Sequence, residues 1–225
     1  MGLAALFIAV PSAHADAPRR IASFNVCADH LVVALADPSQ IVGLSPYASD
    51  PGISTVVEKA RAFPRLRLQA EALVPYKPDL VLVGPWDRPQ TQRLLKDLGF
   101  RVVSVDVVSD LEAARKQIRD VAALLGHPER GEKLIAEIDA AQRRLAAARG
   151  NWSATALLVG NGGYTVGPNS LASALLVEAG FKPPAGAADR LAEPLHALRR
   201  PEPDRRVRLS RGNGSEVAKA LDPSS

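Results

Sequence analysis

The segment Asp79-Leu80-Val81-Leu82-Val83-Gly84 decides the fold class of this chain. Its four central residues are apolar without alternation, so a strand formed by them would be buried on both faces. Interior strands of parallel sheets have this pattern, because helices cover both sides of such sheets. The segment therefore predicts an interior strand of a parallel sheet.

Apolar runs of strand length alternate with helical patterns on both sides of this segment, which is typical of βαβ units. The chain turns into the first helix at residues 25–29, with Asp29 as the expected N-cap. The predicted elements around the central strand are strand Arg20–Phe24, a helix that runs through Ala36, strand Ile41–Leu44, helix Gln90–Leu98 and strand Arg101–Val105. We expect them to form one N-terminal parallel-sheet α/β lobe over residues 19–108.

A helical region follows over residues 109–150. It contains Leu111–Leu125 and Pro128–Arg149, separated at Gly126-His127. Pro128 suits a first helical turn and Gly150 suits a helix end. The second helix, Pro128–Arg149, should span about 30 Å, enough to connect two lobes.

A second α/β lobe is expected to begin at residue 151. Residues 151–188 contain a predicted strand, Ala154–Val159, and a predicted helix, Ser170–Ala179. The tail at residues 189–225 includes Arg199-Arg200-Pro201-Glu202-Pro203 and lacks a convincing apolar strand. We expect the second lobe to be incomplete and the tail to be divergent or frameshifted.

The apolar run at residues 2–10 is followed by Ala13-His14-Ala15, which predicts a secretory signal peptide over residues 1–15. The run is shorter than the roughly 20 residues that a transmembrane helix needs. A buried first strand or helix is the alternative. No Lys or Arg precedes the run, which leaves the true start codon open.

Composition narrows the function classes. The formal charge is +4, but basic residues are scattered among acids, so we expect no nucleic-acid partner. Cys27 is the only cysteine and cannot form a disulfide within the chain. Three histidines of the exported chain, His30, His127 and His196, lie far apart in the sequence, so we expect no metal site built from them.

The motifs leave two alternative functions open, a metal or haem-iron site and an enzyme. Cys27 and His30 form a Cys-x-x-His pair that could ligate haem iron or another metal, although we expect a buried cysteine beside a helix histidine. The Gly-rich stretch at residues 160–163 lacks the spacing of a dinucleotide site, and no Gly-x-Ser-x-Gly is present. We expect no enzyme and no cofactor, with an α/β enzyme as the less favoured alternative.

Four stretches carry a family resemblance by their order and spacing. They are Arg20–Asn25 leading to Asp29-His30-Leu31 and Ile41-Val42-Gly43, Glu71–Val81, Leu98–Val103, and Gly167–Leu171. Over about residues 20–182 the chain resembles the periplasmic binding proteins for ferric siderophores, haem and vitamin B12. The resemblance implies two α/β lobes joined by one long rigid helix. It also implies a monomer in the periplasm that delivers a metal chelate to an ABC permease.

The resemblance places the ligand between the lobes, at loops that follow the strands. Asn25, Tyr47, Trp86, Arg88 and Tyr164 are the predicted ligand-binding residues. Exposed aromatic faces suit planar or macrocyclic ligands, and an arginine suits an anionic chelate. Packing of Tyr47 or Trp86 at the loop base is the alternative.

The resemblance also implies that Glu71 docks against arginines of the permease, the alternative being a solvated glutamate at a helix start. The choice among hydroxamate or catecholate siderophores, haem and cobalamin stays open. So does a metal-ion or haem-iron binding protein of the same architecture.

Overall fold

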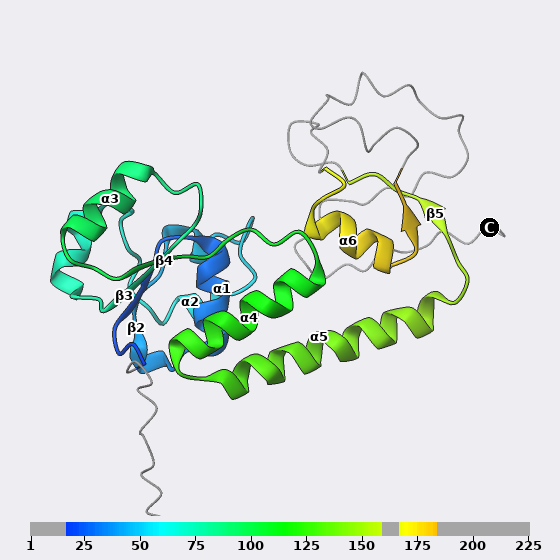
Figure 1. Cartoon of the computed structure of the whole chain (residues 1–225), viewed down its shortest axis with the longest axis horizontal. Helices are drawn as coiled ribbons and strands as arrows, with labels where there is room; N and C mark the ends of the chain where they lie inside the picture. Colours follow the sequence, from blue (N-terminus) through cyan, green and yellow to red (C-terminus); the bar gives the residue numbers. More distant parts are fainter. Residues whose placement is uncertain (1–16, 159–166, 184–225) are drawn as a thin grey trace, which may run out of the picture.

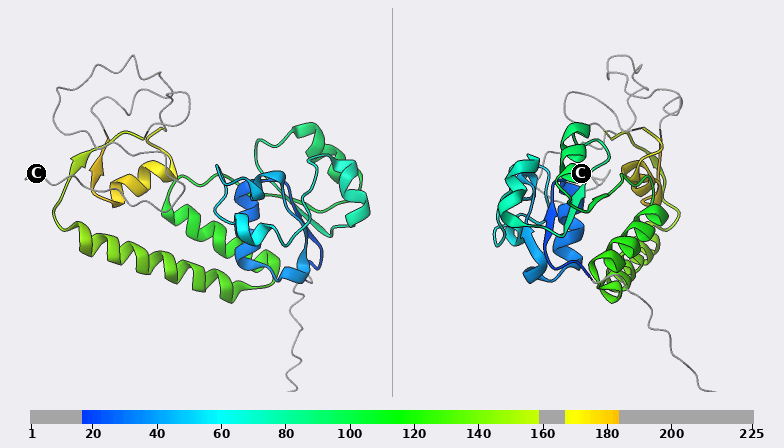
Figure 2. Two further views of the ribbon diagram at one scale, coloured as in Figure 1. Left: turned by 180° about the vertical axis from the view of Figure 1, so that it is seen from behind. Right: turned by 60° about the vertical axis from the view of Figure 1, so that its left-hand side comes forward.

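The computed structural model describes residues 17–158 and 167–183. Two α/β parts are joined by a pair of long helices that run side by side (Figures 1 and 2). The predicted signal peptide at residues 1–15, the predicted ligand residue Tyr164 and the tail at residues 189–225 lie outside the described residues.

The first part is built on a four-stranded parallel sheet with strand order β2-β1-β3-β4. The strands are β1 (Ile21–Ser23), β2 (Ile41–Gly43), β3 (Leu80–Val83) and β4 (Val102–Ser104). Each lies within its predicted range and ends slightly earlier than predicted. All residues of β3 are buried, and β3 pairs with β1 and β4, which confirms the interior parallel strand.

Helices cover both faces of this sheet. The helical segments of the first part are α1 (Val26–Leu35), α2 (Val57–Ala60) and α3 (Pro89–Asp97), with short 3₁₀ turns η1 (Pro38–Gln40), η2 (Pro46–Ser49) and η3 (Ala70–Tyr76). One core lies between the sheet and α1, around Ile21, Leu80 and Leu82. The other core lies on the opposite face, around Val81 and Val83. Successive side chains of β3 point to opposite faces of the sheet and therefore pack into two separate hydrophobic cores.

The N-cap prediction for the first helix was wrong. Asn25, rather than Asp29, caps α1, and its Oδ1 accepts a hydrogen bond from the Cys27 amide at 2.9 Å. The cap is set by the residue at which the extended backbone ends, and β1 ends at Ser23. Asp29 lies one turn later and is fully buried.

The segment before β3 is the 3₁₀ helix η3. Pro75 lies inside η3 and has no amide hydrogen to donate to a helical ladder. The helix ends at Lys77, whose φ of 44° is left-handed. The Asp79 carboxylate then accepts the Arg19 and Arg20 amides at 2.8 and 3.0 Å, which aligns the starts of β1 and β3.

The two long helices are α4 (Leu111–Leu125) and α5 (Pro128–Arg149), which confirms both predicted ranges. Ile118, Val121, Ala122 and Leu125 of α4 are buried, and the last three join the core that contains α1. The α4–α5 pair is also fixed by an Arg115–Asp139 ion pair at 2.7 Å. At the base of α5, the Arg130 guanidinium donates to the Leu35 carbonyl at 3.0 Å and to Asp37.

The second part contains β5 (Ala154–Thr155), α6 (Leu171–Glu178) and β6 (Phe181–Lys182), with β5 and β6 parallel. Arg149 Nη1, at the end of α5, donates to the carbonyls of Val177 and Glu178 at 3.3 and 3.1 Å. No residue of α6 is buried, so the described part of this lobe has no closed core. None of the described helices combines the length and apolar character needed to cross a lipid bilayer.

Candidate functional site

The order of the strands marks one edge of the first sheet as a place for a ligand. From β1 the chain moves to β2 on one side, and β3 and β4 lie on the other side. Open parallel sheets bind ligands at the carboxyl ends of the strands, at the point where the winding direction reverses. In this molecule that point lies between the ends of β1 and β3, at Asn25 and Gly84.

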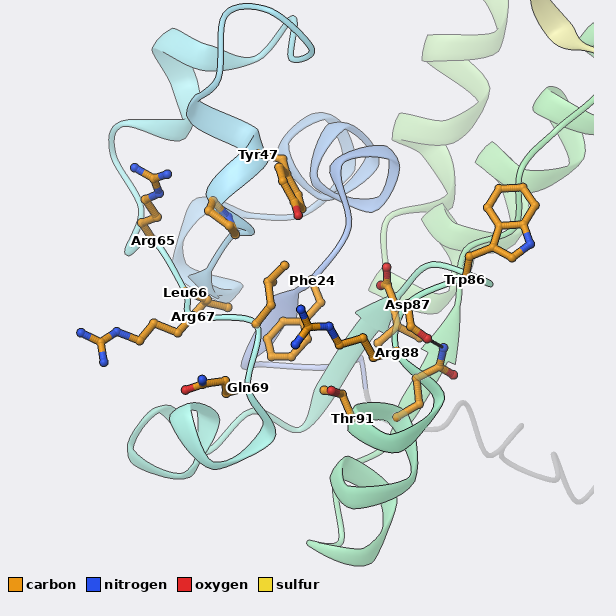
Figure 3. Close-up of a pocket in the computed structure, with 14 residues that line it drawn as sticks. Phe24, Tyr47, Arg65, Leu66, Arg67, Gln69, Trp86, Asp87, Arg88 and Thr91 are labelled. Carbon is orange, nitrogen blue, oxygen red and sulfur yellow. Dashed lines mark hydrogen bonds between the residues drawn. The ribbon is translucent and has the colours of Figure 1, made fainter. Parts of the chain in front are cut away.

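A cavity of about 710 Å³ lies at this edge, and we call it the N-lobe cavity. Figure 3 shows side chains from several loops gathered around it. Its lining residues come from the ends of β1, β2 and β3, from the segment before η3 and from the start of α3: Phe24, Pro46, Tyr47, Arg65, Leu66, Arg67, Leu68, Gln69, Val83, Trp86, Asp87, Arg88, Thr91 and Gln92. Three predicted ligand residues, Tyr47, Trp86 and Arg88, thus share one cavity.

The two aromatic residues present free surface at this edge. The side chain of Trp86 is 81% exposed and that of Tyr47 is 45% exposed, so neither is packed at a loop base. The Tyr47 amide donates to the Ser45 hydroxyl oxygen at 3.2 Å, which fixes the backbone of its turn. Both rings are available to a ligand.

Asn25, another predicted ligand residue, lies at the end of β1 and caps α1. Its side-chain oxygen is used by the helix cap, and among the described residues Asn25 does not line the N-lobe cavity. Its amide packs against Gly84, where an added methyl group would lie 2.4 Å from Asn25 Nδ2. The role of Asn25 in the structure is therefore to shape the junction of β1 and β3.

Asp29 holds the loop that carries Tyr47. The Asp29 carboxylate accepts the Ser45 hydroxyl at 2.5 Å and the Ser45 amide at 3.1 Å, and both residues are buried. Burial raises the pKa of Asp29, and the hydrogen bonds from Ser45 oppose this shift. A chain of hydrogen bonds thus links Asp29 of α1 through Ser45 to the backbone of Tyr47.

A second cavity of about 620 Å³ lies between the two parts, and we call it the interlobe cavity. Its lining residues come from α1, the loops after β3 and β4, helix α4, and the start of α6 with the two residues before it: Cys27, Pro85, Trp86, Asp106, Val107, Val108, Ser109, Gln117, Asn169, Ser170, Leu171 and Ala172. Trp86 lines both cavities.

The Cys27 expectation was wrong, because its side chain is exposed and lines the interlobe cavity. The thiol is nevertheless partly desolvated, and this desolvation is the main cause that raises the pKa of Cys27. The negative charges of Asp29 and Asp87 raise this pKa further. His30 Nε2 accepts the Thr55 amide at 3.2 Å, and burial lowers the pKa of His30. Within residues 17–158 and 167–183, no group of three or more His, Cys, Asp or Glu residues is arranged to hold a metal ion.

The sequence analysis missed Arg65 and Arg67, which line the N-lobe cavity. Leu66, between them, is buried, and its amide donates to the Leu44 carbonyl at 2.8 Å. The alternation Arg65-Leu66-Arg67-Leu68 was a usable signal, because a period of two predicts one buried and one exposed face. Glu71, the predicted docking residue, is exposed at the start of η3.

Solved structures similar to this one include several periplasmic binding proteins. A periplasmic heme-binding protein from Pseudomonas aeruginosa matches with a TM-score of 0.61 and 25% identity, over 74% of this chain and 62% of that chain. The apo form of the periplasmic heme-binding protein RhuT from Roseiflexus sp. RS-1 matches with a TM-score of 0.63 and 28% identity, over 79% of this chain and 70% of that chain. The periplasmic vitamin B12 binding protein BtuF of Vibrio cholerae shares the fold, with a TM-score of 0.58 and 20% identity, over 74% of this chain and 66% of that chain.

The chain spans 62% of the length of the Pseudomonas protein that it matches. No curated protein sequence matches it significantly. The family model described as "Periplasmic binding protein" matches residues 21–199, which is most of the chain. The parallel sheet, the long helices and this match have one explanation: the chain belongs to the periplasmic binding protein family.

Proposed function

We propose that this chain is a periplasmic solute-binding protein that captures a metal chelate and delivers it to an ABC import permease. The ligand classes are ferric siderophores, haem and cobalamin. The position of Trp86 carries the proposal, because an exposed tryptophan that lines two cavities suits a large ligand with flat faces. The two heme-binding relatives support haem among these classes.

The proposed ligand lies across Trp86 and contacts both parts of the molecule. Tyr47 and Arg88 contact it from the N-lobe cavity, and Leu171 at the start of α6 contacts it from the interlobe cavity. Tyr164, which lies outside the described residues, stays a proposed contact. Asn25, at the junction of β1 and β3, also stays a proposed contact. Because α4 and α5 are tied together and to both parts, we expect only small closing motions on binding.

The protein works in this proposal as a monomer in the periplasm and catalyses no reaction. Glu71 is the proposed contact to an arginine of the permease, since its side chain is exposed on the first part. A charge-reversing Glu71→Lys substitution is expected to abolish stimulation of the permease ATPase while ligand affinity stays unchanged. A loss of ligand affinity, or full stimulation by the variant, would contradict the docking role.

Intrinsic fluorescence tests the binding function directly. The chain has two tryptophans, Trp86 and Trp152, so the Trp152→Phe variant reports on Trp86 alone. We expect saturable quenching of this variant by at least one of haem, cyanocobalamin and a panel of ferric siderophores, after correction for ligand absorbance. The single variant Trp86→Phe, which keeps Trp152, is the matched comparison, and its fluorescence should be quenched much less. If folded protein binds none of these chelates, the proposed function is wrong.

A further inference from the structure

Helix α6 in the second part of the molecule is apolar on nearly all of its sides. All of its residues except Ser173 and Glu178 are apolar, yet none of them is buried. The side chains of Leu175 and Val177 are 46% and 54% exposed. A helix that is apolar all round is normally buried in a folded protein, because contact of this surface with water is unfavourable. The composition of α6 therefore indicates that another segment covers it.

A cavity of about 190 Å³ lies beside α6, and we call it the second-lobe cavity. The hydroxyl of Ser173, a polar group of its wall, already donates to the Gly167 carbonyl at 2.8 Å. An apolar cavity of about 150 Å³ accepts a molecule of the size of benzene, so this one has room for roughly one or two leucine side chains. The wall is formed mainly by apolar residues of α6, of β6 and of the segment after β5: Ala156, Leu157, Leu158, Pro168, Ser173, Leu176, Val177, Phe181, Lys182 and Pro183.

The chain continues from this cavity into the tail. Lys182 and Pro183 both line the cavity, and residues 184–225 follow directly after them. The connection from Pro183 to Leu191 spans up to roughly 26 Å when it is extended. Helix α6 has eight residues and is about 12 Å long. A segment that begins at Leu191 can therefore reach every part of α6 and the cavity beside it.

The tail carries apolar side chains at this distance from the cavity. Leu195 and Leu198 follow Pro194, which suits the first turn of a helix, and their spacing would place them on one side of that helix. Leu191 precedes Pro194 and adds a third leucine. Residues 191–198 therefore supply side chains of the kind and size that the second-lobe cavity accepts.

We propose that the segment at residues 191–198 docks on α6 and that its leucine side chains fill the second-lobe cavity. Part of the tail that was expected to be divergent thus belongs to the folded second lobe. The contact also supports the site of the proposed function, because Ser170 and Leu171 at the start of α6 line the interlobe cavity. The docking itself does not depend on that function.

Cysteine cross-linking tests the contact directly, because Cys27 is the only native cysteine. In the full chain carrying Cys27→Ser, we expect Val177→Cys/Leu195→Cys to form a disulfide within one chain on mild oxidation with diamide. Val177 is exposed and lines the cavity, so its replacement disturbs little. The matched control, Val177→Cys/Leu209→Cys, places the second cysteine further along the tail. Its disulfide should form about tenfold more slowly, because the two Cα atoms must come within about 7 Å.

Amide hydrogen exchange tests whether the contact covers α6. Leu195→Asp/Leu198→Asp puts charge into the proposed contact, so the α6 amides should exchange about tenfold faster than in the parent. Val207→Asp/Leu209→Asp makes the same kind of change further along the tail, and this control should exchange like the parent. Unchanged exchange in β3 shows that the first part of each variant is folded.

Equal cross-linking rates for the two cysteine pairs, or unchanged α6 exchange in the Leu195→Asp/Leu198→Asp variant, would overturn the docking. A disulfide between two chains, in place of one within a chain, would show that a second copy covers α6 and would overturn it as well. Non-reducing electrophoresis separates these two products. None of these measurements uses a chelate, so a failure of the docking leaves the proposed binding function standing, and a failure to bind chelates leaves the docking standing.

Discussion

Asp29 offers a sharp test of how the first helix positions the loop of Tyr47. Its carboxylate accepts both the hydroxyl and the amide of Ser45, at 2.5 and 3.1 Å, in a buried place. The Ser45 hydroxyl oxygen in turn accepts the Tyr47 amide at 3.2 Å. Removing the carboxylate should therefore loosen the turn η2 as well as lower the stability of the protein.

The magnitude follows from the groups left without partners. Asp29→Ala leaves the amide and hydroxyl of Ser45 unsatisfied, at about 1–3 kcal/mol for each buried group. Loss of the desolvation penalty on the carboxylate offsets part of this cost. We expect a net loss of about 2–4 kcal/mol, a large share of the roughly 5–15 kcal/mol that stabilises a typical domain. Asp29→Asn keeps one acceptor oxygen and nearly the same shape, so its loss should be about 1 kcal/mol.

The contribution of Asp29 to stability should decrease as the pH rises, which is the opposite of the usual behaviour of an acidic residue. Burial raises the pKa of Asp29 above its ordinary value of 3.8, so the folded protein binds this proton more tightly than the unfolded chain does. The stabilisation is fully present below pH 3.8 and is lost as the pH rises through the folded-state pKa. The stability advantage of the parent over Asp29→Asn should therefore grow as the pH falls from about 7 toward about 4.

Urea unfolding followed by circular dichroism measures these differences, and amide hydrogen exchange reports on the turn. We expect the Tyr47 amide to exchange faster in Asp29→Ala than in the parent. Asp97→Asn, which changes an exposed acid at the end of α3, is the control and should stay within about 0.5 kcal/mol of the parent. An Asp29→Ala loss below about 0.5 kcal/mol, with unchanged exchange at Tyr47, would refute the reasoning.

Four further substitutions test local packing in the two parts of the molecule. Gly84→Ala places a methyl group 2.4 Å from Asn25 Nδ2, and urea unfolding should show a loss of about 1–3 kcal/mol in the free energy of unfolding. Gly126→Ala should destabilise more than Gly99→Ala in urea unfolding: both have positive φ, but the added methyl meets a side chain at 2.5 Å only at Gly126. Arg149→Ala should speed amide exchange in α6 and leave β3 unchanged, because it removes the hydrogen bonds to the end of α6.

The long helices could be predicted from the sequence to the residue. Gly126 ends α4 in a left-handed conformation, Pro128 starts α5 and Gly150 ends it, so local chemistry alone sets these boundaries. The strand β3 could be predicted equally well, because a short unbroken apolar run is typical of a parallel strand that is buried on both faces. Both features depend on residues that are adjacent in the sequence.

The wall of the site depends on contacts that the sequence does not display. Arg65 lines the cavity because Leu44 and Arg65 form an isolated parallel bridge beside β2, and this pairing is set in three dimensions. The exposure of Cys27 and the burial of Asp29 follow from where β1 ends and which face of α1 meets the core. A shift of the cap by one turn was enough to misassign Asp29.

The N-lobe cavity is built entirely from residues between Phe24 and Gln92, whereas the interlobe cavity also needs residues from α6. The walls of the first cavity stand on a sheet with a closed core on each face, and α6 in the second lobe has no buried residue. Fixed walls lose little freedom when a ligand binds, so their contacts convert more fully into affinity. The N-lobe cavity should accordingly supply most of the discrimination between ligands. Trp86, which belongs to both cavities, links the rigid half of the site to the half that depends on the second lobe.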